Sequence, residues 1–228
     1  MTDRASSRPR RAARSTKATP APSGQAGTPP AASNPRSQRV RQAVLDAATA
    51  LMLEHGPNGV TVDQIAALSG ASKATIYKHW PNKIAVTIDA FAAHMAQEVP
   101  RPDTGSTRRD LTEQVRAVCA FYASAAGKIF AQLIADVQTD PDGAGLFLER
   151  FLAGRRQAVR ELWDRGLARG DIRPGVDVEI GIDVLFGPAI FRLMTGHAPL
   201  DPAAAAAIAD AALDGLLVNR QDHTPDPA

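Results

Sequence analysis

The sequence predicts an all-α protein, and three observations lead to this expectation. Apolar residues recur at three- and four-residue spacing along most of the chain, which places them on one face of a helix. No segment alternates apolar and polar residues for long enough to indicate a strand. Clusters of glycine and proline divide the periodic stretches into segments of helical length. We therefore expect an N-terminal unit of three helices, followed by a larger C-terminal helical domain.

The overall composition is that of a globular protein with enough apolar residues to form a core. The chain has 228 residues, of which 44% are hydrophobic, and a formal net charge of +2. Cys119 is its one cysteine, which excludes an internal disulfide and favours a small core residue on a helix. No apolar run approaches the ~18–20 residues of a membrane-spanning helix, and no apolar segment follows the N-terminal arginines. We therefore expect a cytoplasmic protein without membrane contact.

Both ends of the chain, residues 1–36 and 219–228, are expected to be disordered. The first segment is rich in Ala, Pro, Ser, Thr and Gly, so it cannot bury enough apolar surface to offset chain entropy. Three roles stay open for it: an inert tail, a basic arm that adds non-specific phosphate contacts, or an organellar transit peptide. Its single acid, Asp3, is outnumbered by seven basic residues, which are Arg4, Arg8, Arg10, Arg11, Arg14, Lys17 and Arg36.

The first predicted helix begins near residue 39, and a second, shorter one follows it. The periodic apolar residues of the first helix end before Gly56-Pro57, a pair typical of a helix stop. Thr61 and Gln64 then have the pattern of a capping box, in which each side chain serves the other residue's backbone amide. This box predicts a second helix from Val62 to Ser69.

A third short helix completes the pattern of a helix-turn-helix unit. Gly70 turns the chain, and Ser72 is placed to cap a helix that ends near Trp80. In such a unit the second of the two short helices enters the major groove of DNA. A fourth helix is expected from Lys83 to about Glu98. Residues 37–98 are thus expected to be a DNA-binding domain with its connecting helix.

The two faces of the third helix support this interpretation. At about 100° per residue, Ile76 and Trp80 fall on one side, where they can anchor the helix to the first two. Ala74 and Lys78 lie on the opposite side, with Thr75 beside them. This outward face is small, polar and basic, which suits close approach to base edges. The alternative is that these side chains form only a helix cap and a solvated face.

Two stretches of this segment carry a family resemblance. They are Gly56 to Ala66, GPNGVTVDQIA, and Gly70 to Lys83, GASKATIYKHWPNK. They resemble the DNA-binding head of the TetR family of transcriptional regulators (TetR/AcrR type). The sequence departs from the family at Trp80, which is more often phenylalanine there, and in its long basic front. Matched position by position, the resemblance implies phosphate or base contacts from nine residues, which are Thr61, Ser72, Lys73, Ala74, Thr75, Tyr77, Lys78, His79 and Lys83.

Behind a linker over residues 99–107, residues 107–218 are expected to form a ligand-binding and dimerisation domain. The stretch from Phe186 to Leu200 resembles the C-terminal domain of one TetR-type subgroup, and in the family the last two long helices pack against their copies in a second subunit. The residues independently favour an interface, because the helix near 177–195 is apolar nearly all round. We expect a homodimer through this helix and the next, the alternative being a wholly internal core. The expected helices lie near 108–125, 128–139, 144–169, 177–195 and 202–218, divided by Gly127, by Pro141-Asp142-Gly143, by the turn Gly170 to Gly175 and by Gly196 to Pro199.

The helices between residues 108 and 169 are expected to enclose a pocket for a small-molecule effector. Gln132, Asp136 and Arg155 either orient a ligand or face water, and no single ligand-binding residue is assigned. Apolar residues at this spacing are also what a plain core requires. The candidates for lining the pocket are Phe121, Phe130, Leu133, Phe147, Phe151 and Trp163.

The sequence gives no support for catalysis, metal binding or a cofactor. The five histidines are scattered, there is no Cys-x-x-Cys pair, and no nucleophile elbow, Walker loop or dinucleotide fingerprint occurs. The expected function is a repressor that a small molecule releases from a palindromic operator on double-stranded DNA, since repression is the family's usual mode. Two alternatives stay open: a ligand-independent DNA-binding dimer whose rear domain serves a protein partner, and an all-α enzyme.

Overall fold

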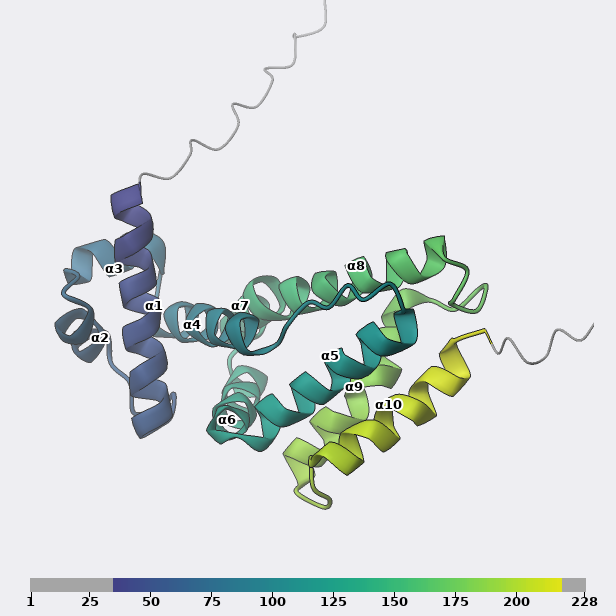
Figure 1. The fold of residues 1–228 in the computed structure, drawn as a ribbon. Coiled ribbons are helices and arrows are strands. Elements are labelled where there is room, and N and C mark those ends of the chain that lie inside the picture. Colours follow the sequence, from purple (N-terminus) through teal and green to yellow (C-terminus); the bar gives the residue numbers. More distant parts are fainter. Residues whose placement is uncertain (1–34, 219–228) are drawn as a thin grey trace, which may run out of the picture. The chain divides into compact units, whose positions relative to one another are not determined.

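A computed structural model describes residues 35–218 of the protein, and the elements it contains are helices (Figure 1). The expected all-α fold is confirmed over this range, where strand-like pairing is limited to an isolated antiparallel bridge between Ile172 and Leu217. The expectations for residues 1–34 and 219–228 lie outside the described residues. In chain order the elements are α1 (Pro35–His55), α2 (Val62–Ser69), α3 (Lys73–His79), α4 (Lys83–Glu98), α5 (Thr107–Ala123), α6 (Ala125–Thr139), α7 (Pro141–Phe147), the π-helical turn η1 (Leu148–Leu152), α8 (Ala153–Ala168), α9 (Val178–Thr195) and α10 (Pro202–Leu216).

Helix α1 begins earlier than the sequence predicts. Pro35 and Arg36 belong to the helix and not to the tail expected over residues 1–36. A proline fits the first helical position because its φ is preset and its missing N–H has no intrahelical acceptor there. The helix packs on α2 and α4, and Val44 and Met52 are buried at these contacts.

The starts of α2 and α3 are fixed by local hydrogen bonds that the sequence predicts. The Thr61 hydroxyl accepts from the Gln64 amide at 3.2 Å, and Gln64 Oε1 accepts from the Thr61 amide at 2.8 Å, so the capping box is confirmed. The Ser72 hydroxyl caps α3 by accepting from the Thr75 amide at 3.1 Å. Between the two helices Gly70 has a left-handed φ of 69°, which a side chain would strain.

Helices α5 and α6 meet at a bend of 84°, and Ser124 occupies the bend. Its hydroxyl donates to the Phe121 carbonyl at 2.7 Å and accepts from the Ala126 amide at 3.2 Å. The sequence predicts the break at Gly127, which is wrong, because serine supplies the cap and the glycine lies inside the first turn of α6. Gly127 instead permits close approach, since a Cβ there would overlap the Tyr122 carbonyl oxygen. Among the described residues no single helix is long and apolar enough to cross a membrane, although this bent pair passes the same test.

The segment from Pro141 to Ala168 is a helix with a π-helical turn in its middle. Asp140 caps it by accepting from the Asp142 amide at 3.1 Å, and Pro141 occupies the first turn. The expected helix over 144–169 therefore starts too late. The proline that the sequence suggested as a breaker begins the helix, because an Asp cap precedes it. The π-helical turn η1 has no counterpart in the expectations, and turns of this kind are frequent at functional sites.

Helix α10 runs along α5 and also packs against α9 (Figure 1). The inner side of α9 contributes Ile182 and Leu185 to the core. Its outer side is apolar as well, and large side chains there are exposed in the described chain. They are Ile180, Val184, Phe191 and Met194, which recur at intervals of three, four and seven residues along one face.

Candidate nucleic-acid interface and interior pocket

Helix α3 turns its apolar side inward and its polar side outward. Ile76 and Trp80 are each 1% exposed, which confirms the prediction that they belong to the core. Tyr77, by contrast, is 52% exposed. The result is a short helix whose outer surface is free to meet a partner. The other predicted contact residues on α3 are exposed or half-buried: Lys73, Ala74 and Lys78 are exposed, and Thr75 and His79 are half-buried.

The remaining predicted contact residues lie at helix starts next to α3. Thr61 and Ser72 are exposed caps of α2 and α3, where free backbone amides favour anions. Lys83 begins α4, and its ammonium group donates to the Pro57 carbonyl at 3.4 Å. The structure thus places all nine predicted residues on the starts of α2 and α4 and on α3.

The three lysines of this surface differ in their partners. Lys73 forms an ion pair with Asp63 of α2. The hydrogen bond to this carboxylate raises the pKa of Lys73, so the side chain stays cationic. Lys83 is held by the Pro57 carbonyl. Lys78 makes no hydrogen bond or ion pair within the described part of the chain, so its charge is available to an outside anion.

Sequence reasoning missed a buried carboxylate that ties the end of α3 to three other elements. Asp89 of α4 accepts through one oxygen, Oδ2, from Trp80 Nε1 at 2.8 Å, from Arg41 of α1 at 3.0 Å and from Arg150 of η1 at 3.2 Å. The Arg41 guanidinium also lies over the Trp80 ring, 5.5 Å from its centroid. The side chain at position 80 therefore positions the C-terminal end of α3.

The departure from phenylalanine at position 80 is explained by this contact. A phenylalanine ring has no donor, whereas the Trp80 indole N–H reaches the Asp89 carboxylate. The indole was a signal in the sequence that a buried acceptor was needed. The full set of contacts was not readable, because the other two donors to Asp89, Arg41 and Arg150, are 48 and 61 residues away from it along the chain.

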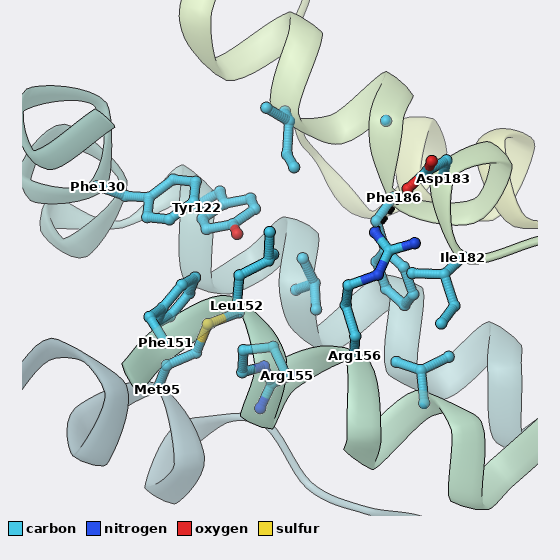
Figure 2. A pocket seen from close by; sticks show the side chains of 14 residues that line it. Met95, Tyr122, Phe130, Phe151, Leu152, Arg155, Arg156, Ile182, Asp183 and Phe186 are labelled. Atoms are coloured by element: carbon cyan, nitrogen blue, oxygen red, sulfur yellow. Dashed lines mark hydrogen bonds and ion pairs between the residues drawn. The ribbon is translucent and has the colours of Figure 1, made fainter. Parts of the chain in front are cut away.

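A pocket of about 200 Å³ lies inside the C-terminal helices (Figure 2). Its lining is mainly apolar and comes from α4, α5, α6, η1, α8 and α9. Of the predicted lining residues, Phe130 and Phe151 contact the pocket. Phe121, Leu133, Phe147 and Trp163 are absent from its lining and pack elsewhere.

The polar residues considered for the pocket divide in the same way. Asp136 accepts from Asn58 Nδ2 at 3.4 Å on the exposed surface, and Gln132 lies beside Gly56. Arg155 lines the pocket, as does its neighbour Arg156. Figure 2 shows Arg156 reaching Asp183, an ion pair of 2.7 Å.

A glycine turn followed by a short helix with a polar outer face, in front of a helical domain with an interior pocket, defines a helix-turn-helix DNA-binding protein with a second helical domain. Family models match both parts. Residues 44–88 match the model of bacterial regulatory proteins of the tetR family, and residues 101–212 match the tetracyclin repressor-like C-terminal domain.

The chain also resembles known regulators over most of their length. It is 38% identical over 160 residues to YdeS, an HTH-type transcriptional regulator of Bacillus subtilis (strain 168), covering 70% of this chain and 81% of the relative. It is 28% identical to a DNA-binding transcriptional repressor TetR of Mycobacteroides abscessus, covering 80% and 95%. The crystal structure of the TetR family transcription regulator SCO0332 superposes with a TM-score of 0.72 at 36% identity, covering 78% and 98%. The chain therefore belongs to the TetR family of helix-turn-helix transcriptional regulators, which bind DNA as dimers.

Proposed function

We propose that this regulator is a repressor that a small-molecule effector releases from a palindromic operator, and that it has no enzymatic activity. In this proposal residues 37–98 form the DNA-binding domain and residues 107–218 the ligand-binding and dimerisation domain. The observation that carries the proposal is the outward polar face of α3. That face is anchored from behind by two buried side chains, Ile76 and Trp80.

The contacts to DNA divide by chemistry. Ala74 and Thr75 are small enough to let α3 approach base edges, and Thr75 and His79 supply polar atoms or methyl contacts there. Lys73, Tyr77, Lys78 and Lys83 are suited to phosphates, which fix the position of the helix on the duplex. Thr61 and Ser72 add helix N-termini directed at phosphate oxygens. Lys78 is the strongest candidate for a phosphate contact, because no group of the described chain pairs with its ammonium.

The proposed dimer uses the outer face of α9 together with α10. Phe191 is 62% exposed and Ile180 58% exposed in the single chain, and a second copy would cover both. Two copies related by a two-fold axis would present two α3 helices to successive major grooves, roughly 34–36 Å apart. A palindromic operator follows from that symmetry.

The proposed release by an effector uses the contacts around η1. Phe151 and Leu152 of this turn line the pocket, while Arg150 of the same turn pairs with Asp89. Asp89 in turn holds Trp80 at the end of α3. A ligand that moves η1 would thus alter the support of the recognition helix. It shifts occupancy only if it binds the two head arrangements with different affinity.

The pocket also discriminates between this proposal and a ligand-independent dimer. A rear domain that serves only dimerisation or a protein partner is expected to have a filled interior. The described chain instead has a pocket of about 200 Å³ between α5, α8 and α9. This pocket favours the ligand-responsive mode.

Footprinting on the DNA upstream of the protein's own coding region tests the DNA contacts. We expect a protected palindrome whose affinity falls about tenfold or more in Lys78→Ala and more weakly in Tyr77→Phe. The slope of affinity against salt should decrease by about one in Lys78→Ala, because one phosphate contact is lost. Lys128→Ala, which removes an exposed lysine of α6, is the matched control and should change neither quantity. Diffuse binding that both α3 variants leave unchanged would contradict the proposal.

A further inference from the structure

Arg155 is a partly buried cation in the pocket, and no acidic side chain among the described residues pairs with it. No carboxylate of the described chain lies within 4.0 Å of its guanidinium, although its neighbours Arg150 and Arg156 are both paired with acids. Its one polar partner is neutral. With the Gln114 amide oriented to satisfy both of its groups, the Gln114 oxygen accepts from Arg155 Nη2 at 3.1 Å and its nitrogen donates to the Pro100 carbonyl at 2.6 Å.

The surroundings of Arg155 make its charge costly in the empty pocket. Burial lowers the pKa of Arg155, and the nearby charge of Arg101 lowers it further. A buried charge is stabilised when an opposite charge and hydrogen bonds replace the water that it lost. Within the described residues that opposite charge is missing, so the site favours an anion from outside.

Tyr122 supplies a second polar group to the lining of the pocket. Its side chain is almost fully buried, and its hydroxyl makes no hydrogen bond within the described chain. Figure 2 shows this hydroxyl directed into the pocket, beside Leu152. Burial raises the pKa of Tyr122 well above its usual range, so the group stays protonated and can donate a hydrogen bond.

Arg156, the other arginine that lines the pocket, is paired with acids of α9. Its guanidinium binds Glu179 Oε2 at 2.5 Å, Asp183 at 2.7 Å and the Glu179 carbonyl at 3.0 Å. It therefore joins α8 to α9, and two acids already balance its charge, which weakens its attraction for a ligand carboxylate. Arg155, one residue earlier, is left with a neutral amide.

Apart from the ion pair between Arg156 and Asp183, the rest of the pocket lining is apolar, and the pocket is small. Phe130, Phe151, Val159, Ile182, Phe186 and Ile190 form walls that suit a hydrocarbon or aryl group. The volume of about 200 Å³ is below the roughly 300–1,000 Å³ of pockets for drug-sized ligands. A ligand that fits both ends has one acid group and a short apolar body.

We propose that the pocket binds a small amphipathic monocarboxylic acid, whose carboxylate pairs with Arg155 and accepts a hydrogen bond from Tyr122. This inference rests on the proposed role of the C-terminal domain as the effector site, and it names the chemical class of the effector. The apolar part of the ligand lies against Phe130, Phe151 and Ile182.

Calorimetric titration of the full-length protein with two acids and their neutral isosteres tests the inference. The probes are octanoate with octanamide and phenylbutyrate with phenylbutanamide, since each amide has nearly the shape of its acid but is neutral and carries an NH2 group in place of one carboxylate oxygen. We expect at least one acid to bind about tenfold or more tightly than its amide, because a charge-assisted pair replaces a neutral contact. Arg155→Gln should reduce this ratio to about one, Arg155→Lys should retain part of it, and Tyr122→Phe should lower the affinity for the acid.

Two controls keep the outcome interpretable. Arg109→Gln removes an exposed arginine of α5 with the same change in net charge, and should leave the ratio unchanged. Circular dichroism and operator binding establish that each variant is folded. Equal affinity for acid and amide, a preference that survives Arg155→Gln, or no binding of either acid at millimolar concentration would each overturn the inference.

The operator experiment is kept separate, so that the two proposals fail independently. A specific footprint with no discrimination between acids and amides would overturn the ligand class and leave the DNA-binding proposal standing. Acid-selective binding without a specific footprint would support the ligand class and contradict the proposed mode of regulation.

Discussion

Asp89 is a buried carboxylate that joins three other elements, and no motif in the sequence indicates it. One carboxylate oxygen accepts from an indole and from two guanidinium groups, which come from α1, from the end of α3 and from η1. The Asp89 side chain is 9% exposed, whereas Arg41 is 50% and Arg150 26% exposed, so solvent screens the contact with Arg41 more than the contacts with Trp80 and Arg150. Removing the acceptor leaves two cations and an indole N–H without their partner.

Substituting Asp89 is therefore expected to destabilise the fold strongly. Asp89→Ala should lower the free energy of unfolding by about 3 kcal/mol or more, since the partners of a buried charge become uncompensated. Urea unfolding at a fixed protein concentration measures this change. Asp46→Ala is the control, because Asp46 is exposed and accepts only from Gln42, at 2.8 Å; it should cost less than about 0.5 kcal/mol. Equal effects of the two substitutions would show that the Asp89 cluster adds no stability.

The thiol of Cys119 is expected to be inert in the folded protein. It is fully buried in α5, and burial raises its pKa because the thiolate is poorly solvated there. At about pH 8, where an exposed thiol is partly ionised, a chromogenic disulfide reagent should react only after denaturant is added. Stoichiometric reaction with the native protein within the mixing time would contradict this expectation.

At the scale of elements, the sequence predicted what local chemistry decides. The capping box at Thr61 and the Ser72 cap involve partners three residues away, so the starts of α2 and α3 are encoded in a few adjacent positions. The spacing of Ile76 and Trp80 fixed which side of α3 is buried. The outward side followed from it without any knowledge of the rest of the fold.

Features that depend on distant contacts were not predictable in the same way. Nothing in the spacing around residues 148–152 distinguishes a π-helical turn from an α-helix, and the contacts of Arg150 and Phe151 in this turn are with residues distant in the sequence. The pocket shows the same limit. Phe130 and Phe121 are both aromatic residues on predicted helices, yet only Phe130 of the two lines the pocket, and spacing along the chain does not distinguish them.

Two glycines inside helices are expected to respond oppositely to the same substitution. A Cβ at Gly181 of α9 would overlap the Trp163 ring, so Gly181→Ala should destabilise by about 1–3 kcal/mol. Gly154 of α8 has no atom within 4 Å of such a Cβ, and Gly154→Ala should stabilise by up to about 1 kcal/mol through helix propensity. Thermal unfolding of both variants measures the difference. A common sign would contradict the role of Gly181 in letting α9 approach α8.

At the scale of the whole molecule, the DNA-facing surface and the pocket are connected through few elements. Helix α4 carries Asp89, which holds the end of α3, and also Met95, which lines the pocket. The turn η1 also contacts both: its Arg150 pairs with Asp89, and its Phe151 lines the pocket. Helix α4 and the turn η1 thus each connect the pocket to the residues that hold the end of α3. A ligand that shifts both elements would couple occupancy of the pocket to the position of the recognition helix.

The outer face of α9 is the proposed dimer interface, and a substitution there tests it. A charged side chain at Phe191 would face the partner's apolar surface and lose its hydration there, which is costly without a counter-charge. Phe191→Glu should therefore convert the dimer to a monomer in sedimentation experiments at micromolar concentration. Operator affinity should fall steeply at the same time, because the two recognition helices are no longer linked and each half-site must bind alone.

Leu167→Glu separates this effect from a general response to a surface charge. Leu167 is 49% exposed, but it lies on α8 and not on the outer face of α9, so its substitution should leave the protein dimeric. The folded monomer of Phe191→Glu should still melt cooperatively, because the core residues Ile182 and Leu185 on the inner side of α9 are untouched. If Phe191→Glu remains a dimer with full operator affinity, the interface lies on another face, and the exposed apolar residues of α9 need a different partner.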